Sequence, residues 1–156
     1  MRILVISDTH GNVELLKKVI NKEKDVNDII FLGDGAKDIE MIKDKNIIAV
    51  KGNNDIHCKF NNSEVKEINN KKIFMTHGHI YHVKITLDKI IKEAAKVNAD
   101  IILYGHTHSA MNKYYNGVHI MNPGSLSGYK PSYGYIDILD NGDIVTNIVE
   151  ARFNNE

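Results

Sequence analysis

Residues 2–12 read RILVISDTHGN and set a pattern that recurs along the chain. The run Ile3-Leu4-Val5-Ile6 is apolar and rich in β-branched side chains, which predicts a strand buried on both faces. A polar cluster with a glycine follows this run, and it predicts that the strand ends there. Apolar runs at residues 29–32 and 47–50 repeat the pattern, and each is followed by another glycine-containing polar cluster.

Two helices are expected between these three strands. Residues 13–24 place Leu16, Val19 and Ile20 at three- and four-residue spacings, which is typical of a helix with one apolar stripe. A shorter helix is predicted over residues 36–44. The resulting order, β-α-β-α-β, indicates parallel strands covered by helices.

The second half of the chain predicts a mixed set of strands with one helix, which Thr86 can cap. A turn at Asn69-Asn70 indicates a hairpin, and Asn116-Gly117 and Asn141-Gly142 are strong two-residue hairpin signals. The predicted strands cover residues 64–69, 72–76, 100–104, 110–115, 118–121, 134–139 and 143–150. At 156 residues the whole chain, 1–156, is expected to form a single domain.

The composition of the chain limits the kinds of molecule that it is expected to bind. The chain has 20 Lys and Arg against 20 Asp and Glu, so no global field favours nucleic acid or an anionic membrane. It shows no signal peptide and no apolar stretch long enough to span a bilayer. The single cysteine, Cys58, excludes an intrachain disulfide and suits a reducing compartment. We therefore expect a cytoplasmic protein.

Five of the predicted strands end in a polar cluster that contains metal-ligand residue types. The clusters are Asp8-Thr9-His10, Gly33-Asp34, Gly52-Asn53-Asn54-Asp55, His77-Gly78-His79 and Gly105-His106-Thr107-His108. In α/β sheets, ligands bind outside the carboxyl ends of the strands. Turn chemistry explains Gly, Asn and Asp at such places, but it does not explain paired histidines. The clusters together predict a metal site at one sheet edge.

Taken singly, several of these residues have a plainer interpretation. Asp8-Thr9-His10 could be a surface turn, and Gly33-Asp34 could be an Asx turn. His79 and His82 could be solvated loop residues. By contrast, His106 and His108 follow a glycine in one loop, and two histidines in such a loop are more often metal ligands than packing residues. Three further residues are interpreted as structural: His57, Cys58 and His119.

The order Asp-x-His, Gly-Asp, Gly-Asn-x-Asp, His-Gly, Gly-His-Thr-His resembles the calcineurin-like metallophosphoesterase superfamily. Length and the Asn122-Pro123-Gly124-Ser125 turn narrow the resemblance to the small YfcE/YsnB-type phosphodiesterases. The resemblance covers about residues 1–150. It implies a four-layer α-β-β-α sandwich with two mixed sheets and two metal ions along the sheet edges.

The resemblance also implies which residues hold the metals. One metal would be bound by Asp8, His10, Asp34 and His108, and the other by Asp34, Asn53, His77 and His106. Asp34 would bridge them, and a hydroxide between the metals would be the nucleophile. A set of oxygen and imidazole ligands suits Mn²⁺, Fe²⁺, Zn²⁺ or Ni²⁺, and the family favours manganese.

Other site residues are expected around these ligands. The resemblance implies that Asn54 stands where many superfamily members have a histidine that can protonate the leaving oxygen or bind the phosphate, and an amide cannot act as a general acid. His79 could supply that proton from the opposite loop. Asp55 is expected to orient a ligand. Asn12 and Ser125 are candidates for phosphate binding.

The expected function is a phosphodiesterase acting on a small phosphodiester. A phosphomonoesterase of the same fold and a non-catalytic scaffold, like the related retromer subunit, are the alternatives. The chain lacks a basic stripe with aromatics, which disfavours a nuclease and any nucleic-acid partner. No membrane partner is expected, and a homodimer is left open.

Overall fold

Two five-stranded sheets form the centre of the computed structural model, which describes residues 1–153. In the first sheet the strands lie in the order β10 (Ile144–Glu150), β9 (Ser132–Ile138), β1 (Arg2–Ile6), β2 (Asp28–Phe31) and β3 (Asn46–Ala49). In the second the order is β4 (Ser63–Ile68), β5 (Lys71–Thr76), β6 (Ile101–Leu103), β8 (Val118–Asn122) and β7 (Met111–Tyr115). Strands β1, β2 and β3 are parallel, as are β5, β6 and β8, while the remaining four pair antiparallel.

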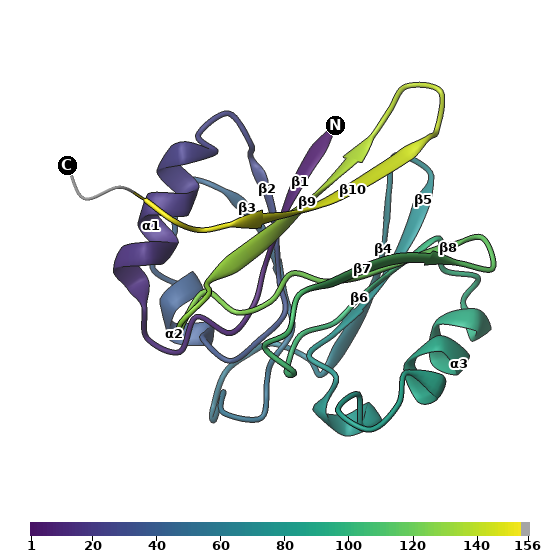
Figure 1. Cartoon of the computed structure of the whole chain (residues 1–156), viewed down its shortest axis with the longest axis horizontal. Helices are drawn as coiled ribbons and strands as arrows, with labels where there is room; N and C mark the ends of the chain where they lie inside the picture. Colours follow the sequence, from purple (N-terminus) through teal and green to yellow (C-terminus); the bar gives the residue numbers. More distant parts are fainter. Residues whose placement is uncertain (154–156) are drawn as a thin grey trace.

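Helices cover the outer face of each sheet (Figure 1). On the first sheet lie α1 (Val13–Lys22) and α2 (Ala36–Ile39), and on the second lies α3 (Asp88–Lys96). A short 3-10 helix, η1 (His79–Tyr81), follows β5. No helix among residues 1–153 is long and apolar enough to cross a membrane.

The apolar side chains of β1 explain the layers. Because successive side chains of a strand point to opposite faces, Leu4 and Ile6 pack toward α1, while Ile3 and Val5 pack against the second sheet. A third core lies between the second sheet and α3, where Ile102 meets Ile90. The three cores separate four layers, α-β-β-α, so the predicted fold class is confirmed.

One predicted element is wrong in length. The helix expected over residues 36–44 ends after a single turn, at Ile39. Ile39 and Ile42 still reach the first core, but from a turn rather than a continuous helix. Lys45 then ties this segment to the loop between α1 and β2, because its ammonium donates to the carbonyls of Lys24 and Val26 at 2.9 and 2.8 Å. The chain must turn here to enter β3 at Asn46.

Candidate metal centre

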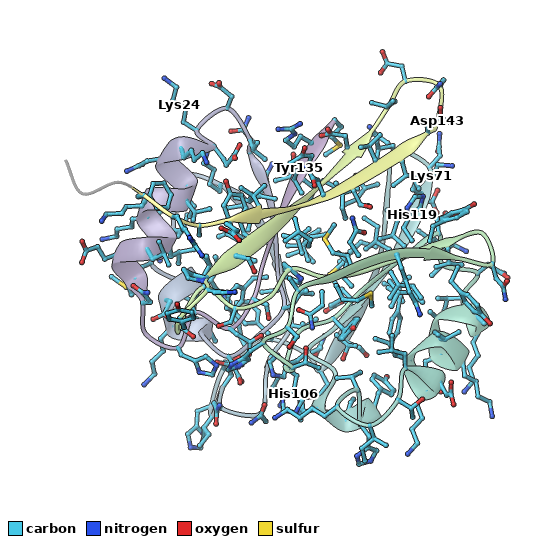
Figure 2. All side chains as sticks on the ribbon, viewed as in Figure 1. Lys24, Lys71, His106, His119, Tyr135 and Asp143 are labelled. Carbon is cyan, nitrogen blue, oxygen red and sulfur yellow. The ribbon has the colours of Figure 1, made fainter. Side chains whose placement is uncertain are left out.

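Seven side chains predicted as metal ligands lie together where the parallel strands of both sheets end. They are Asp8, His10, Asp34, Asn53, His77, His106 and His108. Six of them form two groups, and within each group one ligand atom per residue lies within 4.8 Å of the others. The first group is Asp8, His10 and His108, and the second is Asp34, His77 and His106. Figure 2 shows His106 at this lower edge of the molecule, whereas His119 lies far from it, near Lys71.

The first group surrounds a buried carboxylate oxygen that has no hydrogen-bond partner among the described residues, Oδ1 of Asp8. This oxygen lies 3.2 Å from Nε2 of His108 and 3.5 Å from Nε2 of His10. The two Nε2 atoms are 3.1 Å apart. The other oxygen of Asp8 accepts hydrogen bonds from the Ser7 hydroxyl and the His106 backbone N–H. A buried oxygen without a partner is costly, so this donor set fits a cation.

The second group is built around His77, which is fully buried. Its Nδ1 lies 2.7 Å from the carbonyl of Leu32, so an N–H there donates to that carbonyl and directs Nε2 toward the group. Nε2 lies 3.1 Å from Oδ1 of Asn53, 3.2 Å from Nδ1 of His106 and 3.4 Å from Oδ2 of Asp34. This is again a cluster of oxygen and imidazole donors suited to a transition metal.

Asp34 belongs to the second group but also faces the first. Its Oδ2 is 3.4 Å from Nε2 of His77 in the second group and 3.8 Å from Nε2 of His10 in the first. Asn54 supports this carboxylate from the far side, since its backbone and side-chain N–H groups donate to Oδ1 and Oδ2 at 2.9 and 3.0 Å. The carboxylate therefore faces both groups.

The electrostatics of the site favour positive charge. Burial alone raises the pKa of Asp34, but hydrogen bonds from His77 and the Asn54 backbone, with the charges of His77 and His10, lower this pKa to about 2. Burial likewise lowers the pKa of His77, yet the hydrogen bond to Asp34 and the charges of Asp8 and Asp34 raise it overall. The ion pair between Asp34 and His77 contributes to both shifts, since it favours the charged form of each group.

Five of the seven predicted ligand residues have a positive backbone φ, which non-glycine residues rarely adopt. They are Asp8, His10, Asp34, His106 and His108, with φ between 44° and 71°. Such conformations cluster at functional sites and persist only where the surroundings enforce them. Here the backbone N–H of Asp8 donates to Gly33 at 2.9 Å and that of His10 to Asp34 at 3.1 Å, which fixes the first loop against the second.

Two glycines allow the ligand loops to approach each other. A Cβ atom on Gly52 would overlap the carboxylate of Asp34, and one on Gly105 would overlap the Ser7 hydroxyl and crowd Asp8. The glycines of the Gly-Asn and Gly-His motifs are therefore required by close packing.

Asp55 holds the backbone that carries Asp34. Its carboxylate accepts hydrogen bonds from the backbone N–H groups of Asp34, Gly35, Ala36 and Gly52, at 2.7 to 2.9 Å. It therefore joins the end of β2, the start of α2 and the loop after β3.

The candidates for phosphate binding are engaged in structural hydrogen bonds. Asn12 caps α1, with its Oδ1 accepting from the backbone N–H of Leu15 at 3.2 Å. The Ser125 hydroxyl is buried and donates to the carbonyl of Asp8 at 2.7 Å. Their role in phosphate binding stays a prediction.

His79, the candidate general acid, lies beside the second group. Its ring centre is 5.4 Å from that of His77 and 6.1 Å from that of His106. Burial, and then the charge of His77, lower the pKa of His79. His82 lies three residues further on and is exposed.

Asp38 is a supporting residue that sequence reasoning missed. It is buried, and its Oδ2 accepts from the Thr9 hydroxyl at 2.6 Å and from the Gly11 backbone at 2.8 Å. It therefore holds the residues on both sides of His10. The only signal in the sequence is an acidic residue inside a predicted helix, which is more commonly exposed.

Comparison with known proteins identifies the family. Residues 1–141 match the family described as the calcineurin-like phosphoesterase superfamily domain. The chain belongs to this superfamily. It is 33% identical over 127 residues to the probable metallophosphoesterase YsnB of Bacillus subtilis, which covers 81% of this chain and 75% of YsnB. It is also 33% identical over 161 residues to the phosphodiesterase MJ0936 of Methanocaldococcus jannaschii, covering 90% and 93%.

Solved structures of other proteins share the fold. A predicted phosphoesterase from Streptococcus pneumoniae superposes with a TM-score of 0.80 at 25% identity, covering 96% of this chain and 89% of the other. Vps29 of Entamoeba histolytica, solved in complex with zinc, superposes with a TM-score of 0.75 at 23% identity, covering 97% and 100%. The prediction that the chain belongs to the calcineurin-like phosphoesterases is thus confirmed. Its relatives include YsnB, as the sequence indicated.

Proposed function

We propose that this phosphoesterase is a phosphodiesterase that works with two divalent metal ions, both of which contact Asp34. The observation that carries the proposal is the position of the Asp34 carboxylate, with Oδ2 3.4 Å from His77 and 3.8 Å from His10. Asp8, His10 and His108 would complete the first metal site, and Asn53, His77 and His106 the second. Two such ions supply an acidified water as nucleophile and stabilise charge on the phosphoryl oxygens.

The residues around the metals set the net charge of the site. Among the seven ligands only Asp8 and Asp34 are anionic, since Asn53 and the histidines are neutral when they bind a metal. Two divalent ions therefore leave the site positive. A phosphate ester is attracted by this local charge although the chain as a whole is neutral.

We propose manganese as the metal. The ligand set contains four imidazoles, two carboxylates and one amide, which suits a transition metal better than Ca²⁺ or Mg²⁺. The site geometry itself is compatible with several transition metals.

The non-catalytic alternative is a scaffold like Vps29. Since a Vps29 structure contains zinc, bound metal alone does not separate a scaffold from an enzyme. What favours an enzyme is that a competent residue occupies every ligand position and that relatives such as MJ0936 are phosphodiesterases. The cytoplasmic location and a homodimer stay predictions.

Substrate profiling tests the proposed reaction. Purified protein with added Mn²⁺ should hydrolyse phosphodiesters with a larger kcat/KM than the phosphomonoesters of the same alcohols. Paired libraries of diesters and monoesters provide the comparison. Preference for the monoesters would favour the phosphomonoesterase alternative, and no turnover of either class would favour the scaffold.

Hydrolysis should also depend strongly on the leaving group. Asn54 has no ionisable proton, and its amide is engaged with Asp34. The leaving oxygen must therefore depart as an anion, which nitrophenolate does readily and an alkoxide does not. General acid catalysis is typically worth about 10²- to 10⁴-fold, so Asn54→His is expected to speed cleavage of alkyl diesters by about 10²-fold.

Rates measured against leaving-group pKa check this expectation, with His79→Ala as the matched comparison. A steep dependence in both the natural protein and His79→Ala supports the absence of a general acid. A flat dependence that becomes steep in His79→Ala would identify His79 as the acid instead.

A further inference from the structure

A cleft of about 550 Å³ leads away from the metal ligands. Its lining includes His10 and Asp34 of the metal centre, together with Asn54. The rest of the lining comes from Gly11, from residues in and around α2, and from residues 55–58 of the loop that follows β3. This volume lies in the range of small-molecule binding sites, so a substrate phosphate held at the metals could extend one of its ester groups into the cleft.

Most of the buried polar groups in the walls are already satisfied. The Asp55 carboxylate accepts four backbone hydrogen bonds, and Asp38 accepts two. These carboxylates hold the loops and do not serve as free partners for a ligand. What the cleft offers a substrate beyond the phosphate therefore depends on its more exposed side chains.

Ile56 is the largest apolar side chain among the residues that line the cleft, and it is 72% exposed. The residues on either side of it have defined positions. Asp55 is anchored by its four hydrogen bonds, and His57 adopts a left-handed conformation with φ of 62°. The loop thus presents an apolar surface two residues beyond Asn54, at a site where folding does not cover it.

The charges of the cleft disfavour a second anionic group. Among the lining residues, Lys37 and Glu40 carry opposite charges. The carboxylates of Asp34, Asp38 and Asp55 also line the cleft. Beyond the metals no excess of positive charge is present among the lining side chains. A second phosphate in the cleft would therefore find Lys37 as the one Lys or Arg among the lining residues, and Glu40 is there to offset it.

We propose that this cleft binds one ester group of the substrate and that this group is an uncharged alcohol with an apolar or aromatic face, covered by Ile56. The proposal rests on the phosphodiesterase function proposed above, because the metals hold the phosphate. It assigns Ile56 as a specificity-determining residue and excludes from this cleft a group that carries further phosphates.

Phosphonates test the proposal because each carries only one organic group. Phenylphosphonate is expected to inhibit hydrolysis of bis-nitrophenyl phosphate with an inhibition constant about tenfold lower than that of methylphosphonate, since it can cover Ile56. 4-Carboxyphenylphosphonate should inhibit more weakly than phenylphosphonate. In Ile56→Ala the advantage of phenyl over methyl should largely disappear, while inhibition by inorganic phosphate stays unchanged.

Ile85→Ala is the matched control, because Ile85 is 84% exposed on the loop after β5 and does not line the cleft. This variant should retain the preference for phenylphosphonate. An equal preference in Ile56→Ala and in the natural protein would overturn the proposal. Absence of bis-nitrophenyl phosphate hydrolysis in the natural protein would instead contradict the proposed function, so the two failures are distinguishable.

Discussion

Phosphodiester hydrolysis is expected to stop when metal is stripped from the protein with EDTA, and to return with Mn²⁺ but not with Ca²⁺. The reason is the ligand chemistry of the two groups, since imidazole nitrogens favour transition metals and Ca²⁺ prefers six to eight oxygens. Without metal, the carboxylates of Asp8 and Asp34 would repel the phosphate. With metal bound to them, the positive charge of the ions would attract it. Activity after dialysis and after addition of each ion is the measurement.

Metal stoichiometry completes this experiment. Reconstituted protein should hold two Mn²⁺ ions per chain, and a structure with manganese should place Asp34 in contact with both. One isolated ion, with Asn53 and His77 turned away from it, would contradict the proposed dinuclear site. Full activity in excess EDTA after dialysis would contradict metal dependence altogether.

His106→Ala is expected to lower kcat/KM by at least about 10³-fold while the fold persists. A metal acting as a Lewis acid contributes several kcal/mol to transition-state stabilisation, and about 4 kcal/mol corresponds to about 10³-fold in rate. The fold should persist because His106 lies in the loop after β6 and is only half-buried. The hydrogen bond from its backbone to Asp8 does not need the side chain.

His119→Ala provides the control for His106→Ala. His119 lies in β8, with its ring centre 4.7 Å from that of Tyr114 and at a distance from the metal centre (Figure 2). This variant should retain hydrolysis near that of the natural protein. Circular dichroism and thermal unfolding of both variants report on the fold. A kcat/KM equal to that of the natural protein in a folded His106→Ala variant would show that His106 is not needed for catalysis.

The layered fold was predictable because its signals are local. β-Branched runs mark the buried strands, and residues with helical spacing mark α1 and α3. The predicted cap is wrong by one residue: Leu87 is the N-cap of α3 and makes no side-chain cap hydrogen bond, while the Thr86 hydroxyl just before it accepts from the backbone N–H of Asp88 at 3.2 Å. The length of α2 was not predictable, because Ile39 and Ile42 have helical spacing and only the return of the chain to β3 ends the helix early.

Supporting residues were harder to predict than ligands. Asn12 and Asp38 are polar residues near a motif. Their spacing does not distinguish a residue that caps a helix or supports a loop from one that contacts the substrate. Their hydrogen-bond partners come from other segments or depend on the exact start of a helix. The role proposed for Ile56 was also hard to predict, because the sequence does not show whether an apolar residue in a loop is buried or exposed.

By itself, the sequence determined which side chains could bind metal, because a ligand residue in a glycine-containing cluster directly after a buried strand must lie at the carboxyl end of that strand. Only the tertiary structure decided how these ligands combine. Each group draws on both sheets: His108, after β6, joins Asp8 and His10, after β1, while His77 and His106 join Asp34, after β2. The alignment of the two sheet edges depends on how Ile3, Val5 and their neighbours pack between the sheets. Packing of this kind joins residues 98 positions apart, such as His10 and His108, which no local sequence pattern can specify.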